Sequence, residues 1–167
     1  VHPGWLPPLL EALDEGAAGV QPLLLYGDRT VQTAGTVFLG GMTMPSHLLS
    51  GLHPLDVGTQ VDAYPFSAVT AACMAVRTDH VAALDGFDPR YVNGMEDVDF
   101  CLRLKELTGA PLRVRTDSRV VHFESRSIGR GDHHDANRDR FAERWSAVLQ
   151  ELDDRRILEA GPVALDR

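Results

Sequence analysis

Three carboxylates lie within four residues of one another, at Glu96, Asp97 and Asp99. The spacing of apolar residues predicts a helix from about Glu96 to Leu107. On such a helix Glu96 and Asp99 share one face, whereas Asp97 points elsewhere from the first turn. Backbone N–H groups and the helix dipole stabilise negative charge there, and a positioned, ionised carboxylate is what a general base requires. The alternative is an acidic helix start with a surface pair between Asp99 and Arg103, worth roughly tenths of a kcal/mol.

Two groups of histidines are candidate metal ligands. His122 ends a strand-like run and precedes a polar loop, which is a common place for a metal ligand, although a single histidine beside a sheet also packs in a core. His133 and His134 lie in a hydrophilic stretch without the HExxH spacing of a specific metal site, which favours a solvated loop. A metal-dependent hydrolase that uses His122, His133 and His134 is one functional alternative.

Helix and strand signals alternate along the chain and must position these groups. We expect helices at 5–13, 79–86, 96–107 and 136–153, the last of them amphipathic, strands at 20–25, 31–39, 66–76, 112–116 and 119–123, and loops at 40–59 and 124–135. The apolar run at 66–76 predicts a central strand covered on both faces. The alternation predicts an α/β or mixed fold in a single domain over residues 1–167.

Composition excludes several classes of protein. The chain has 167 residues, of which 44% are hydrophobic, and a net charge of -8, so it is neither disordered nor a general nucleic-acid binder. No apolar run approaches the roughly 20 residues that span a bilayer. Eight arginines against six acids lie between Arg113 and Arg144. Arginine suits bidentate phosphate contacts, but charge alone favours a solvated surface with pairs inside the chain.

Several segments together resemble the C-terminal half of a family 2 glycosyltransferase. They are Phe87-Asp88 with the block from Asp97 to Leu104, the stretch 121–125 with Ser127, the apolar run 69–77, the opening 1–6 and the tail 138–145. The resemblance covers essentially the whole chain. Ala71 stands where the family pattern usually has glycine.

The resemblance implies a GT-A-like α/β fold, with a mixed sheet flanked by helices, and a metal-dependent, inverting sugar transfer. The implied roles are general base for Asp97, site shaping or acceptor binding for Glu96, substrate binding for Thr70 and Ala71, metal ligand for His122, and contacts to the donor pyrophosphate for Arg126 and Arg130. The implied cofactor is a divalent metal, Mn²⁺ or Mg²⁺, which would neutralise the leaving nucleoside diphosphate. The implied partners are a nucleoside-diphosphate sugar donor and a glycan or lipid-linked acceptor, as in surface polysaccharide synthesis.

The main departure from the family is the lack of its nucleotide-binding half and of its metal-binding DxD acids. We therefore expect this chain to be the acceptor-side, C-terminal portion of a longer enzyme, which begins just after the DxD motif and is inactive alone. The alternative is a non-catalytic, glycosyltransferase-like fragment that packs against a partner domain. The expected location is the cytoplasm, at most peripheral to the inner membrane face.

Overall fold

The centre of the fold is a mixed β-sheet built on strand β1 (Gly19–Leu25). The computed structural model describes residues 3–40, 44–123, 133–159 and 161. Strand β6 (Leu112–Val121) pairs in parallel with every residue of β1. Strands β2 (Val31–Thr33) and β5 (Ala75–Val76) pair antiparallel with opposite ends of β1. Every residue of β1 is buried, as expected for a strand with neighbours on both edges and elements on both faces.

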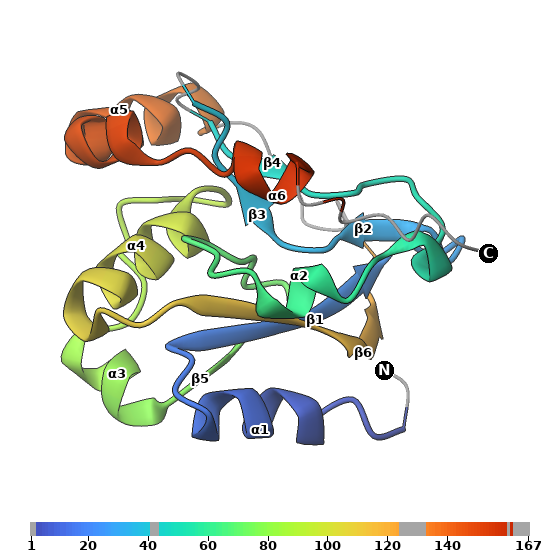
Figure 1. Ribbon diagram of the computed structural model, residues 1–167. Coiled ribbons are helices and arrows are strands. Elements are labelled where there is room, and N and C mark those ends of the chain that lie inside the picture. Colours follow the sequence, from blue (N-terminus) through green and yellow to red (C-terminus); the bar gives the residue numbers. More distant parts are fainter. Residues whose placement is uncertain (1–2, 41–43, 124–132, 160, 162–167) are drawn as a thin grey trace.

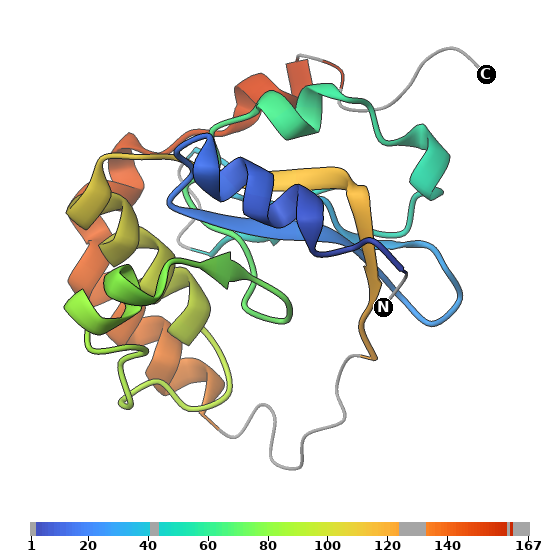
Figure 2. The same ribbon diagram turned by 90° about the horizontal axis from the view of Figure 1, so that it is seen from below.

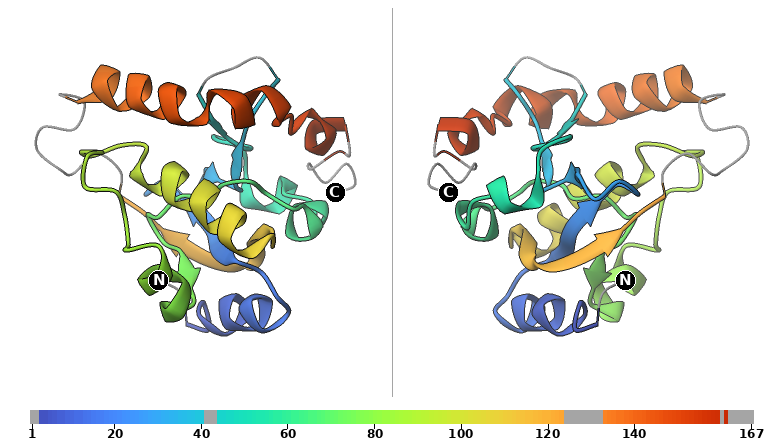
Figure 3. Two further views of the ribbon diagram at one scale, coloured as in Figure 1. Left: turned by 90° about the vertical axis from the view of Figure 1, so that its left-hand side faces the viewer. Right: turned by 90° about the vertical axis from the view of Figure 1, so that its right-hand side faces the viewer.

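Helices cover the sheet on opposite sides. Helix α1 (Pro7–Asp14) lies below β1 and β6 in Figure 1 and in front of them in Figure 2. Its residues Leu9 and Ala12 form a small core with Val20. Helices α4 (Glu96–Thr108) and α5 (His134–Glu151) lie away from α1, with α5 farthest from it in both views of Figure 3. The buried apolar residues of α5, with Val98, Cys101 and Leu102 of α4, belong to the main core, which includes Leu23 and Leu25 of β1, whereas Phe100 and Leu104 of α4 form a smaller cluster with Ala18.

Short elements complete the described chain. They are strands β3 (Thr36–Val37) and β4 (Ser46–His47), which pair as a separate two-stranded sheet, a 3-10 turn η1 (Pro54–Asp56), and helices α2 (Gln60–Ala63), α3 (Thr78–Ala83) and α6 (Arg155–Glu159). The segment 40–59, expected as one long loop, therefore carries β4 and η1. None of the helices in the described ranges is long and apolar enough to cross a membrane.

The predicted class is confirmed, because a sheet of parallel and antiparallel strands is flanked by helices. The two strands expected at 112–116 and 119–123 are one strand, β6, with an irregularity where Pro22 gives way to Leu23 in the partner β1. Pro22 has no N–H to donate to a ladder, which fits a local break in pairing there. The break expected near Asp117 is thus a bulge within one strand.

The prediction of a continuous central strand at 66–76 is wrong. Only Ala75 and Val76 form β5, and Phe66 and Ala68 make isolated bridges. The segment is apolar because Phe66, Ala68 and Val69 cross the core, where periodicity alone does not separate a strand from other buried backbone. After Val69 the chain turns, and the backbone N–H groups of the next residues bind side chains of β1 and α4.

Candidate active site

A cleft of about 650 Å³ gathers most of the predicted site residues. Among its lining are Thr70, Ala71, Glu96, Asp97 and His122, which come from three separate parts of the chain. The rest of the lining is Thr36, Met44, Pro45, Ser46, His47, Ala72, Phe87, Asn93, Gly94, Met95, Val98 and His134. The other two predicted residues, Arg126 and Arg130, lie outside the described residues.

Asp97 lies in the first turn of α4, half-buried at the wall of the cleft. Its Oδ2 accepts a hydrogen bond from the backbone N–H of Ala71 at 3.1 Å, and its Oδ1 accepts one from the N–H of Val98 at 2.9 Å. A carboxylate has about four lone-pair sites, so these two bonds orient the group and leave capacity for a further donor. The geometry therefore provides an oriented carboxylate with room to accept a proton.

Thr70 and Ala71 are held by side chains on either side of the turn that they form. The backbone N–H of Thr70 donates to Gln21 Oε1 at 2.9 Å, and Gln21 is fully buried in β1. The next N–H, of Ala71, binds Asp97. Ala71 is not among the residues with positive φ, so its backbone does not require the glycine of the family pattern. The turn thus ties the carboxylate of α4 to the central sheet.

A turn with unusual backbone geometry precedes the carboxylates. Asn93, Gly94 and Met95 have φ angles of 54°, 156° and 70°, and Met95 is the N-cap of α4. Residues other than glycine and asparagine rarely adopt a positive φ, so the backbone of Met95 is strained. Glu96 reaches back over the turn, and its Oε2 accepts the N–H of Gly94 at 2.6 Å. This bond places the Glu96 carboxylate at the cleft beside Asp97.

His122 follows β6 and extends its pairing, since its N–H donates to the carbonyl of Leu25. Its Nδ1 lies 2.9 Å from Oε1 of Gln32, which is buried. An amide oxygen only accepts, so this pairing assigns the proton to Nδ1 and leaves the Nε2 lone pair available as a ligand. Within the described ranges, no group of three or more His, Cys, Asp and Glu side chains could hold a metal ion. His122 therefore offers one ligand, and the neighbours that the structure describes do not complete a site with it.

The expectation of a weak surface pair between Asp99 and Arg103 is wrong, because the pair lies in the core. The Asp99 side chain is fully buried, and Arg103 Nε donates to Oδ2 at 2.8 Å. On the other oxygen, Trp145 Nε1 donates to Oδ1 at 2.9 Å and Arg144 Nη1 lies at 3.2 Å. Arg144 also contacts Asp88 at 3.4 Å. The hydrogen bond from Arg90 holds the pKa of Asp88 well below its usual value.

Most arginines of the 113–144 segment that the structure describes bind within the chain. Arg115 pairs with Asp117 and Glu11, Arg113 donates to the carbonyl of Ala63, and Arg119 donates to the carbonyl of Thr116. Arg140 and Arg144, on α5, bind the segment 88–99. For these five residues the reading of intrachain pairing is correct.

A second cavity, of about 720 Å³, lies beside α1, α2 and β6, away from the carboxylates of α4. Its polar groups are bound to one another. Asp62 accepts both the N–H and the hydroxyl of Thr116, and Arg115 binds Asp117. This mutual saturation makes it a weaker candidate for chemistry than the cleft at Asp97.

Sequence reasoning missed the polar residues that hold the site in place. They are Gln21 and Gln32 in the sheet and Asn137 and Trp145 in α5. Gln21 and Gln32 interrupt otherwise apolar strands, which is a signal for a buried polar contact. Asn137 and Trp145 are eight residues apart on one helix and carry no comparable signal without a partner.

The fold and the cleft define an α/β protein with a pair of carboxylates at the start of a helix. No family model matches the sequence. The chain is similar to a segment of the O-antigen biosynthesis protein RfbC of Myxococcus xanthus, with 32% identity over 135 residues, which are 76% of this chain and 10% of that protein. It is also similar to the uncharacterized protein y4gI of Sinorhizobium fredii, with 30% identity over 137 residues, 79% of this chain and 15% of that protein. The chain therefore spans only a small part of the curated relatives that it matches.

Proposed function

We propose that this chain is the acceptor-side part of an inverting family 2 glycosyltransferase, which transfers a sugar from a nucleoside-diphosphate sugar to a hydroxyl of a glycan or lipid-linked acceptor. The observation that carries the proposal is the meeting of Glu96, Asp97, Thr70, Ala71 and His122 in one cleft. Similarity to a segment of an O-antigen biosynthesis protein supports a role in surface polysaccharide synthesis. The proposed location is the cytoplasm, at the inner membrane face for a lipid-linked acceptor.

Asp97 is the proposed general base. Its carboxylate takes the proton of the acceptor hydroxyl as the hydroxyl oxygen attacks the anomeric carbon of the donor. The bond from that carbon to the diphosphate oxygen breaks, the diphosphate leaves with the bonding electrons, and the configuration inverts. The N–H groups of Ala71 and Val98 keep the carboxylate aimed into the cleft throughout. Glu96, half-buried beside it, accepts a hydrogen bond from a second acceptor hydroxyl.

One described residue of the cleft, His122, and two arginines that follow it in the sequence are proposed to act on the donor. His122 would supply Nε2 as a single ligand to Mn²⁺ or Mg²⁺, with its ring held by Gln32. When bound, such an ion supplies positive charge that stabilises the leaving diphosphate. Arg126 and Arg130 follow His122 in the sequence and are proposed to contact the same diphosphate. Thr70 and Ala71 line the same cleft, and the N–H of Ala71 binds the proposed base.

The lining of the cleft indicates an uncharged acceptor. Among the lining residues that the structure describes are two carboxylates, three histidines, several hydroxyls and an amide, but no lysine or arginine. An anionic acceptor would meet the negative charge of Glu96 and Asp97, whereas a neutral sugar offers hydroxyl donors to both. Phe87 lines the cleft with 46% of its surface exposed and packs against Phe100. Its ring is suited to the apolar face of a sugar.

The alternative function is a non-catalytic module that packs against a partner domain. A groove of about 550 Å³ between α1 and the start of α3 favours this alternative. Leu10, Leu13 and Val76 line the groove, and Leu10 is 48% exposed. The rest of its lining is Asp14, Arg77, Thr78 and Asp79, so the groove combines apolar and charged groups. A groove of this kind fits an interface, but a transferase with a further domain would also need one.

The test is sugar transfer by the full-length gene product, supplied with Mn²⁺, a panel of nucleoside-diphosphate sugars and neutral glycan acceptors. Asp97→Asn keeps the shape of the side chain and removes the base, so kcat should fall by about 10²- to 10⁴-fold. Glu106→Gln, an exposed carboxylate on the same helix, is the matched control and should keep the wild-type rate.

Retention of the wild-type rate by Asp97→Asn, within about threefold, would refute the assignment of the base. Lack of transfer with every donor by a folded wild-type protein would favour the non-catalytic module. Circular dichroism of each variant separates loss of the base from loss of the fold.

A further inference from the structure

The turn before the two cleft carboxylates is held by a side chain from a distant helix. Asn137, in the first turn of α5, is only 2% exposed. Its Nδ2 donates to the carbonyls of Val92 and Gly94 at 2.8 Å and 2.9 Å, and its Oδ1 accepts the N–H of Val92 at 3.3 Å. One amide thus satisfies three backbone groups on the segment that leads into α4.

This turn requires outside support because its backbone is not in a favourable conformation. The residues at 93–95 all have positive φ, and two of them are not glycine. Such conformations persist when the surrounding structure over-determines them, and they are common at functional sites. The Gly94 peptide is held from both sides, since its N–H binds Glu96 and the carbonyl of Gly94 binds Asn137. A loss of Asn137 removes one half of this clamp.

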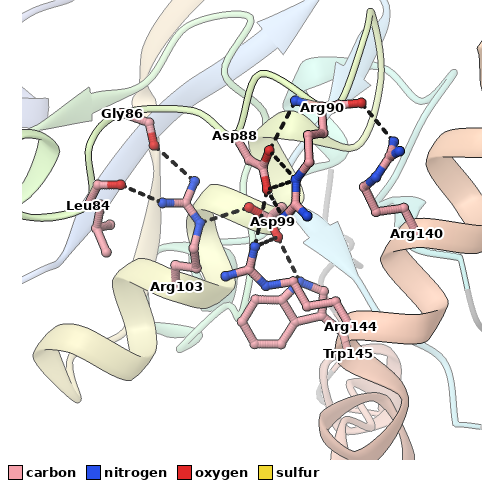
Figure 4. A network of polar contacts seen from close by, with 9 residues as sticks. All are labelled: Leu84, Gly86, Asp88, Arg90, Asp99, Arg103, Arg140, Arg144 and Trp145. Atoms are coloured by element: carbon pink, nitrogen blue, oxygen red, sulfur yellow. Dashed lines mark hydrogen bonds and ion pairs between the residues drawn. The ribbon is translucent and has the colours of Figure 1, made fainter.

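Helix α5 also binds α4 itself, at a second site. Trp145 and Arg144 bind the buried Asp99, eight and seven residues after Asn137 (Figure 4). Eight residues of helix correspond to about 12 Å, or about two turns. In the sequence, Glu96 and Asp97 lie between the two sites that α5 binds, which are the segment 92–94 and Asp99. The segment that carries both carboxylates is therefore held by α5 at either end, while the carboxylates themselves bind the N–H groups of Ala71, Val98 and Gly94.

We propose that Asn137 is a positioning residue, which sets the orientation of Glu96 and Asp97 in the cleft by locking the turn at 92–95. Its role in transfer rests on the proposed function, whereas its role in holding the turn does not. Asn137 does not itself line the cleft, and its described hydrogen bonds go to the backbone of Val92 and of the lining residue Gly94, so it acts on the carboxylates through the backbone. Displacement of a catalytic group by about 1 Å lowers rates by about 100-fold, which sets the scale of the expected effect.

The experiment compares Asn137→Ala with Ser146→Ala, an exposed position on the same helix, in the full-length gene product. Hydrogen–deuterium exchange is followed separately for 92–98, for the remainder of α4 and for the remainder of α5. We expect Asn137→Ala to speed exchange at 92–98 by at least about tenfold and to leave the other two segments unchanged. In the transfer assay we expect kcat to fall by about 10- to 100-fold with the acceptor KM within about threefold. Asn137→Ser retains a short donor and should recover part of both effects.

Wild-type exchange at 92–98 in Asn137→Ala would overturn the proposal. So would faster exchange spread evenly over α4 and α5, because that result means general destabilisation. A local increase in exchange with a wild-type kcat would also overturn the positioning role. If Asn137→Ala does not fold, Asn137→Ser decides by the same criteria. If the wild-type protein transfers no sugar, the proposed function fails, and exchange at 92–98 still decides whether Asn137 holds the turn.

Discussion

The cleft side and the core side of the first turn of α4 carry carboxylates that differ in almost every respect. Asp97 is half-buried, lines the cleft and is bound by two backbone N–H groups. Asp99, two residues later, is fully buried and bound by Arg103, Arg144 and Trp145. Full burial and the bonds from these three side chains leave Asp99 out of reach of a substrate. The difference teaches that the same residue type, at nearly the same place in the sequence, serves chemistry or architecture according to what surrounds it.

The largest expected effect comes from removal of the buried charge. Asp99→Asn leaves the guanidinium groups of Arg103 and Arg144 without their carboxylate, so the free energy of unfolding should fall by about 3–5 kcal/mol. Asp97→Asn keeps an acceptor oxygen at the rim of the cleft and should change it by less than about 1 kcal/mol. Urea unfolding of the two variants measures the contrast. Equal losses for both variants would abolish the distinction between the two sides of the turn.

The second prediction isolates one donor to the buried carboxylate. Trp145→Phe retains a large ring in the core and removes the Nε1 donor to Asp99. A buried acceptor that loses one partner costs about 1–3 kcal/mol of unfolding free energy, as measured by urea unfolding. In the double variant Asp99→Asn with Trp145→Phe, the loss should be smaller than the sum of the single losses, because both changes act on one contact. Full additivity would show that the indole contributes by packing alone.

The third prediction concerns pH. Asp88 joins the network through Arg90 and Arg144, and its pKa is lowered in the folded protein. The folded state therefore binds the proton of Asp88 less readily than the unfolded state, whose value is about 3.9. This contribution to stability is complete above that value and is lost as the pH falls toward the folded pKa. Asp88→Asn should thus weaken the decline in stability between about pH 5 and pH 2, measured by thermal unfolding. An unchanged decline in stability at acid pH would show that Asp88 does not contribute to it.

The smallest expected effect belongs to the cleft side. Phe87→Ala removes an exposed ring that lines the cleft, so the acceptor KM should rise by about 2- to 10-fold while kcat stays close to wild type. Phe87→Tyr keeps an aromatic face and serves as the control. A fall in kcat of the size expected for Asp97→Asn would instead place Phe87 in the support of the base.

Part of the site could be predicted from the sequence because residue types and their local spacing indicate it. Acidic residues at a helix start and a histidine at a strand end led to Asp97 and His122, the family resemblance added Thr70, and the structure brings these three to one cleft. The role of Asp99 was misjudged because helical spacing shows its partner Arg103 but not the second helix that buries it. The roles of Asp97, His122 and Thr70 in a reaction stay predictions.

Other features had no local signal at all. Asn137 contacts residues 43 to 45 positions earlier in the chain, and nothing in its own neighbourhood distinguishes it from a surface asparagine. The apolar run at 66–76 misled for the opposite reason. Residues 66–69 are buried and the rest of the run is half-buried or exposed, yet the whole run is apolar or small, so composition does not decide its hydrogen bonding.

Sequence alone determined the mixed α/β class, the helix that begins at Glu96 and the carboxylates in its first turn, because periodicity, capping and charge act over a few residues. Tertiary structure decided which carboxylate faces the cleft and which is sealed in the core. It also brought α5 to this segment, where Asn137 binds the turn at 92–95 and Trp145 binds Asp99. The physical reason is that burial and hydrogen-bond saturation depend on groups far apart in the chain, and only the packed fold brings those groups within bonding distance.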